Sequence, residues 1–209
     1  MNINLDKSKY VVLDVETNGL ASLEWDLLSI SIYDPDTNES YDRFLPLELN
    51  DCILTTCING ITEDDLKDKT PISQIEFDEI IEKFNLKKRI ILTYGSIDEK
   101  FIKTYCNRHK IIGFDKLNFF NFKHLIISSK FNGENVTKDN LCNLFGIDNV
   151  KKVHSGKNDC IIEWKLFEKI HGKFLLITGC NVFELNDSYV IPISYLETYP
   201  NFKYYRDIP

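Results

Sequence analysis

The sequence contains no apolar run that approaches the ~20 residues needed to cross a membrane. Its first residues, MNINLDKSKY, are polar and lack the apolar segment that follows the basic start of a signal peptide. Internal repeats, proline–glycine–serine linkers and low-complexity runs are also missing. We therefore expect a globular protein that is soluble and cytoplasmic and does not bind membranes.

Positive charge is scarce, because 25 lysine and arginine residues face 32 aspartate and glutamate residues, which gives a net charge of −7. A protein whose main task is to coat duplex nucleic acid normally presents a net basic surface, so this balance argues against that class. The balance agrees with a metal enzyme, because carboxylates that hold divalent cations count in the sum while the cations do not. The compact basic clusters are Lys87-Lys88-Arg89 and Lys151-Lys152, and the second is expected either to guide a nucleic-acid backbone or to be solvated charge at a helix end. The six cysteines form no C-x-x-C pair, which disfavours a zinc ribbon, and we expect buried free thiols.

The apolar pattern predicts a mixed α/β fold. Hydrophobic residues make up 43% of the 209 residues, and a chain of this length buries roughly 70% of its unfolded surface. Strands are predicted over 10–14, 27–33, 41–45, 90–94, 174–177 and 189–191, and helices over 71–84, 97–108, 137–145 and 158–170. Ser96 and Glu99 have the spacing of a capping box at a helix start. This order of elements predicts a mixed sheet with helices packed on its faces, in which chemistry usually takes place at strand ends.

The most specific motif is Asp14-Val15-Glu16, at the end of the first predicted strand. Residues two positions apart on a strand point to the same face, so both carboxylates are expected at the rim of the core. Two adjacent carboxylates resist ionisation, and a hard divalent cation such as Mg²⁺ resolves that conflict. The alternative for this motif alone is a strand that ends in a solvated acidic turn.

Two further motifs carry acids or a histidine. Asp98 lies in the first turn of a predicted helix, where an acid can also serve only to complement the helix dipole. His154 and Asp159 flank the start of the last predicted helix, with Ser155-Gly156 as a loop between them. A neutral histidine beside a carboxylate–metal site is a natural general base, and the alternative is a surface loop.

In this order, the three motifs resemble those of the DEDDh 3′–5′ exonucleases of the DnaQ-like (RNase H-like) superfamily. The matching stretches are VVLDVETNGL (11–20), TYGSIDEKFI (93–102) and HSGKNDCIIEWKLF (154–167). The resemblance covers about residues 8–170. It implies an α/β fold with an RNase H-like mixed β-sheet flanked by α-helices, as an exonuclease domain over 1–172 followed by a C-terminal extension over 173–209 that packs on or beside it.

The resemblance also implies the roles of single residues. Asp14, Glu16, Asp98 and Asp159 would bind two divalent cations, Mg²⁺ or Mn²⁺, and His154 would deprotonate the attacking water. Thr17 and Leu20 look like the contacts to the terminal nucleotide, with a turn residue and a core leucine as the plainer alternatives. The implied reaction is 3′–5′ exonuclease hydrolysis of phosphodiester bonds that releases mononucleotides from nucleic acid with a free 3′ end, with single-stranded DNA favoured.

Two departures bear on the substrate. The family often has asparagine where this chain has Tyr94, and a Tyr-Gly or Trp-Gly start occurs in some branches, RNA-directed ones included, so an exoribonuclease is the first alternative. Gly156 stands where alanine is frequent, which is a change between small residues. A non-catalytic nucleic-acid-binding or scaffold module is the second alternative. The aromatic tail after residue 173 is expected to cover the sheet or to contact a protein, a second copy of the chain included, and base stacking is a weaker reading.

Overall fold

The computed structural model describes residues 5–128, 137–148, 156–171, 174–178 and 181–185. They form two compact units, one of residues 1–123 with 138–169 and one of residues 124–137 with 170–209. The predicted boundary between residues 172 and 173 stays a prediction. Among the described residues, none of the helices combines the length and the apolar character that a membrane crossing requires.

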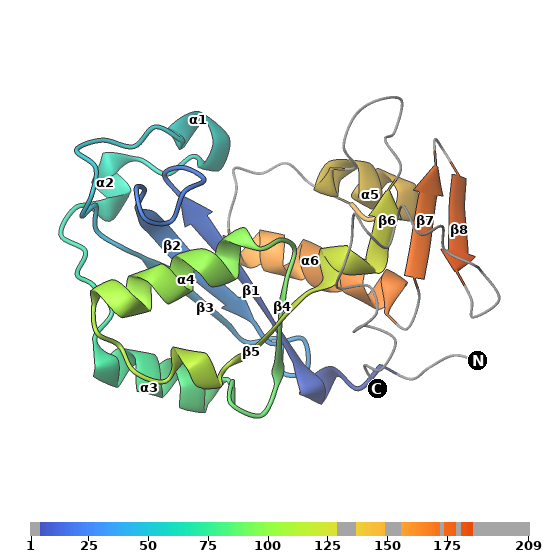
Figure 1. The fold of residues 1–209 in the computed structure, drawn as a ribbon, viewed down its shortest axis with the longest axis horizontal. Coiled ribbons are helices and arrows are strands. Elements are labelled where there is room, and N and C mark those ends of the chain that lie inside the picture. The colour runs from blue at the N-terminus through green and yellow to red at the C-terminus, as the bar shows by residue number, and fades with distance from the viewer. Residues whose placement is uncertain (1–4, 129–136, 149–155, 172–173, 179–180, 186–209) are drawn as a thin grey trace. The chain divides into compact units, whose positions relative to one another are not determined.

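The first unit is built on a five-stranded mixed sheet with the order β3-β2-β1-β4-β5 (Figure 1). Strands β1 (Tyr10–Thr17), β2 (Leu27–Tyr33) and β3 (Ser40–Phe44) form an antiparallel meander. Strands β4 (Ile90–Thr93) and β5 (Asn118–Asn121) continue the sheet in parallel with β1. The predicted α/β class and mixed sheet are confirmed, although β5 was not expected. Its sequence, NFFN, is short and has polar residues at both ends.

Six α-helices accompany the sheets in the described part of the chain. They are α1 (Thr56–Asn59), α2 (Glu63–Leu66), α3 (Gln74–Lys83), α4 (Ile97–Arg108), α5 (Lys138–Phe145) and α6 (Gly156–Ile170). Short 3₁₀ turns lie at Lys7–Lys9, Phe114–Lys116 and Phe122–Leu125. The four helices that the sequence predicts are all present, with ends that differ by at most three residues.

Alternation along β1 assigns its two faces to different helices. Val11, Leu13 and Val15 belong to a core cluster that includes side chains of α3 and α4, which lie on the same side of the sheet in Figure 1. Tyr10 points to the other face, where its ring lies 5.1 Å from that of Phe167 on α6. Because side chains on a strand alternate, Asp14 and Glu16 share the face of Tyr10 and α6.

Two local expectations are wrong. Ser96 precedes α4, but its backbone is helical (φ −103°, ψ −1°) and its side chain makes no capping hydrogen bond. An effective cap needs an extended backbone, so the capping box does not form. Arg89, which the sequence groups with Lys87 and Lys88 as a basic cluster, is 8% exposed and paired with Asp34 at 2.6 Å. It joins the ends of β1 and β2 and is not part of a surface patch.

The second unit contains a three-stranded sheet with the order β6-β7-β8. Strand β6 (Ile126–Ser128) is parallel to β7 (Phe174–Thr178), and β7 is antiparallel to β8 (Asn181–Leu185). The predicted strand over 174–177 is confirmed. The predicted strand over 189–191 lies outside the described residues.

Candidate active site

Three carboxylates meet at the end of the central strand. Oxygen atoms of Asp14, Glu16 and Asp159 all lie within 4.8 Å of one another. The strand supplies the first two on one face, and the residues opposite them on β2 are Ser31 and Ser29. These small neighbours leave room above β1, and the ladder is irregular directly after Glu16. A strand end with this irregularity turns its side chains out of the regular sheet.

Asp159 reaches the cluster because the start of α6 lies directly on β2. A Cβ atom added to Gly156 would overlap the Ser31 side chain and would lie 3.9 Å from Oδ2 of Asp14. Glycine is therefore what allows the helix to begin this close to β1. Asp159 stands in the first turn of α6, where the helix dipole favours a negative charge.

Asp98 contacts the backbone of the Asp14-Val15-Glu16 motif and is not one of the three clustered carboxylates. It is 8% exposed, and its Oδ1 accepts a hydrogen bond of 3.2 Å from the N–H of Val15, the residue between Asp14 and Glu16. The pairing of β1 with β4 ends at Val12, so this bond satisfies a backbone donor beyond that ladder. Asp98 thereby fixes the strand segment that carries the two acids.

The carboxylates of the site are costly to ionise together. Burial, followed by the charge of Asp159, raises the pKa of Glu16 to about 7. Burial raises the pKa of Asp98 to about 6 in spite of its hydrogen bonds to backbone N–H groups. Burial and the charge of Glu163 raise the pKa of Asp14 well above its ordinary value. A divalent cation would offset these costs, because it supplies positive charge to oxygens that already converge.

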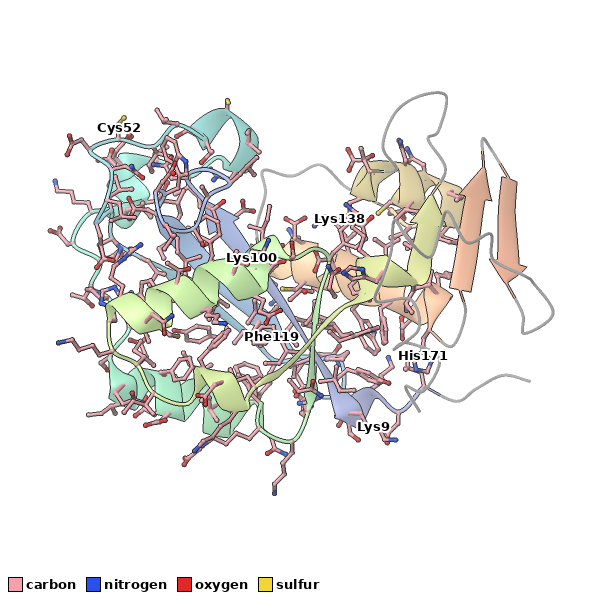
Figure 2. All side chains as sticks on the ribbon, viewed as in Figure 1. Lys9, Cys52, Lys100, Phe119, Lys138 and His171 are labelled. Atoms are coloured by element: carbon pink, nitrogen blue, oxygen red, sulfur yellow. The ribbon has the colours of Figure 1, made fainter. Side chains whose placement is uncertain are left out.

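A lysine and a fifth carboxylate, neither expected from the sequence, complete the site. Lys138, labelled in Figure 2, is the first residue of α5. Its Nζ lies 3.2 Å from Oδ1 of Asp159 and 2.8 Å from Oε1 of Glu163. Burial by itself would lower the pKa of Lys138, but the charges of Glu163, Asp14 and Asp159 outweigh it and raise that pKa. The one available signal was the position of Glu163, four residues after Asp159 and hence on the same helix face.

The remaining predicted site residues are placed differently. His154 lies outside the described residues, as do Lys151 and Lys152. Leu20 is 81% exposed, so the plain interpretation as a core leucine is wrong. The carbonyl of Thr17 accepts a hydrogen bond of 2.9 Å from the Thr55 hydroxyl, which ties the strand end to the segment before α1.

The donor set fits hard divalent cations. Asp14, Glu16 and Asp159 offer carboxylate oxygens, the ligand type that Mg²⁺ and Mn²⁺ prefer. In the described part of the chain, the site includes no Cys–His set that would favour zinc over these ions.

Comparison with known proteins finds distant relatives in sequence and in fold. No protein-family model matches the chain. The curated relatives include the PolC-type DNA polymerase III of Streptococcus thermophilus, 28% identical over 116 residues, and that of Streptococcus pneumoniae, 27% identical over 117 residues. The matches cover 53% of this chain and 8% of each polymerase, so the chain spans only a small part of these relatives.

Solved structures match more of the chain. Exonuclease I of E. coli in complex with a dT13 oligonucleotide has a TM-score of 0.63 at 14% identity, and the match covers 78% of this chain and 41% of that one. The nuclease domain of 3′hExo, described as a DEDDh family member bound to rAMP, has a TM-score of 0.60 at 17% identity. That match covers 85% of this chain and 96% of the domain. The chain therefore has the RNase H-like fold of the DEDDh exonucleases.

Proposed function

We propose that the chain is a metal-dependent 3′–5′ exonuclease that removes mononucleotides from single-stranded DNA. The observation that carries this proposal is the convergence of Asp14, Glu16 and Asp159 at the end of β1, in a chain with the DEDDh fold. The structural relatives support a nucleic acid as substrate, since exonuclease I is described with bound single-stranded DNA.

In this proposal Asp14, Glu16 and Asp159 hold two divalent cations, Mg²⁺ or Mn²⁺, and Asp98 is the fourth acid of the site. When bound, the cations supply charge stabilisation for the attacking and leaving oxygens of the phosphodiester. Asp98 keeps the backbone of Val15 in place, so that the acids on both sides of it point to one face. A ring nitrogen of His154 accepts the proton of the attacking water.

Residues after the motif would bind the end of the strand. Thr17 directly follows Glu16, and Leu20 lies three residues further along, where its exposed side chain offers an apolar surface to a terminal base. A hydrogen bond of 2.7 Å from the Thr17 hydroxyl to the carbonyl of Gly19 shapes the turn between these two residues. The Gly19 position is close to the Trp25 ring, which a Cβ atom would overlap. We expect this turn to admit a free 3′ end and to exclude an uninterrupted strand.

RNA is the second candidate substrate. The relative that matches nearly along its whole domain is described with bound rAMP, and Tyr94 stands where the family often has asparagine. Discrimination between the two would depend on contacts to the 2′-hydroxyl.

One assay tests these proposals together. Single-stranded DNA, duplex DNA and RNA, each labelled at the 5′ end, are incubated with Mg²⁺ or Mn²⁺, with a 3′-blocked strand as a control. A ladder that shortens from the 3′ end of DNA supports the main proposal, and a ladder on RNA alone replaces it with the exoribonuclease. Absence of cleavage on all three substrates would favour a non-catalytic binding module.

A further inference from the structure

Lys138 and Glu163 form an ion pair in the candidate site, and the proposed reaction gives this pair no role. Lys138 starts α5 and Glu163 lies on α6, one helical turn after Asp159. The two interact at 2.8 Å, and Glu163 is 2% exposed. A buried ion pair is costly to form, so its location against a metal ligand calls for a functional explanation.

The ammonium group competes with a cation for one carboxylate. Nζ of Lys138 lies 3.2 Å from Oδ1 of Asp159, an oxygen of the cluster that fits a divalent cation. A cation bound to Asp159 at about 2.1 Å would stand within a few ångströms of that ammonium group, and the two positive charges would repel each other. Lysine and metal therefore cannot both approach Asp159 closely at low cost.

Glu163 provides the alternative position for the ammonium group. Its Oε1 already accepts a hydrogen bond from Lys138, whereas its Oε2 is buried and has no hydrogen-bond partner within the described ranges. Because Oε2 has no hydrogen-bond partner there, Glu163 can bind the ammonium group through both of its carboxylate oxygens. The Tyr94 ring centroid lies 6.0 Å from Nζ, and the face of an aromatic ring attracts a cation.

We propose that Lys138 is a built-in competitor for the metal at Asp159, and that Glu163 holds it aside when a divalent cation binds. This inference rests on the proposed metal site and adds that the pair sets the affinity of the site. Lys138 lowers the affinity by its charge and by its hydrogen bond to Asp159. Glu163 raises the affinity, because it attracts the lysine away from Asp159 and contributes a negative charge of its own.

Mn²⁺ binding, measured at one pH by calorimetry and by electron paramagnetic resonance of the free ion, tests the inference without an activity assay. Lys138→Met should bind Mn²⁺ about tenfold more tightly than the wild type, the size of effect that groups beside metal ligands commonly exert. Glu163→Gln should bind it more weakly by a comparable factor. General damage to the site would weaken binding in both variants, so the opposite signs are the diagnostic result.

Lys157→Met is the matched control. Lys157 is exposed, lies on α6 two residues before Asp159, and loses the same charge when it is replaced. Its Mn²⁺ affinity should stay within about twofold of the wild type if screening by solvent removes the effect of an exposed charge. An equal gain in Lys157→Met and Lys138→Met would overturn the inference, because net charge alone would then explain the result.

Other outcomes are also decisive. Unchanged or weaker binding by Lys138→Met would show that the lysine orients Asp159 for the metal and does not compete with it. If circular dichroism shows that Lys138→Met is unfolded, Glu163→Gln decides, and an affinity equal to or above that of the wild type refutes the inference. A wild-type protein that binds no Mn²⁺ and cleaves no nucleic acid refutes the proposed function and this inference together. A wild-type protein that binds Mn²⁺, with variants that do not differ from it, refutes the inference alone.

Discussion

Replacement of Glu16 by glutamine should stabilise the protein, and the gain should depend on pH. Burial and the charge of Asp159 raise the pKa of Glu16 from 4.5 to about 7. The folded state therefore binds the proton more tightly than the unfolded state, and the wild type loses stability as the pH rises from about 4.5 through about 7. Glutamine keeps the shape of the side chain and never ionises, so the variant avoids this loss.

The pKa difference sets the magnitude. A rise from 4.5 to about 7 corresponds to about 3 kcal/mol in the free energy of unfolding once Glu16 is fully ionised. Glu16 remains partly exposed and water screens its charge, so we take this as an upper value. Between pH 5 and pH 8 the advantage of Glu16→Gln should grow by about 2 kcal/mol.

Urea unfolding in EDTA at several pH values measures this advantage. Glu79→Gln, at an exposed position of α3, is the control. The difference between its free energy of unfolding and that of the wild type should stay the same across the pH range. Addition of Mn²⁺ should reverse the order of stability at pH 8, because a ligand that binds only the folded state stabilises the wild type more than a variant that lacks a metal ligand. A gain from Glu16→Gln that is the same at pH 5 and pH 8 would refute the burial of an ionised Glu16.

Four further predictions concern activity. Activity should require Mg²⁺ or Mn²⁺, with weak or no support from Ca²⁺, and cleavage that persists in excess EDTA would contradict the two-metal site. Asp14→Ala and Asp159→Ala should each lower the rate by several orders of magnitude, while circular dichroism shows an intact fold. Near wild-type activity of Asp14→Ala would show that Asp14 is not part of the catalytic site. His154→Ala should lower the rate about 10²–10⁴-fold and remove the rise of the rate with pH, while Mn²⁺ binding measured by calorimetry stays nearly unchanged. A closed circular single strand should resist cleavage, and linear products on a gel would indicate an endonuclease.

The parts of the fold that follow from local patterns were predictable. The short apolar run over residues 10–13 predicts a buried strand, and the two-residue spacing of Asp14 and Glu16 places both carboxylates on one face of it. The apolar spacing on α3, α4 and α6 predicted helices because each buries one face. The cluster of Asp14, Glu16 and Asp159 was expected from the resemblance, and the geometry brings these three together.

The parts that depend on tertiary contacts were not predictable. Whether Ser96 caps α4 depends on the path of the chain that enters the helix, and that path leaves the Ser96 backbone helical. Arg89 reads as a surface charge in the sequence, but Asp34, which binds it, is 55 residues away in the chain. Lys138 carries no motif, and only the packing of the start of α5 against α6 brings it to Asp159 and Glu163.

Gly156 illustrates how a departure from a family pattern is explained by a contact. The family often has alanine at this position, and the sequence alone indicates an exchange between small residues. In the structure the space that a methyl group would need is filled by Ser31 of β2, which stands opposite Asp14 in the ladder. The two residues therefore depend on each other, because the Ser31 side chain requires glycine at the start of α6. The same approach brings Asp159 within reach of Asp14, so the local packing and the convergence of the carboxylates have one cause.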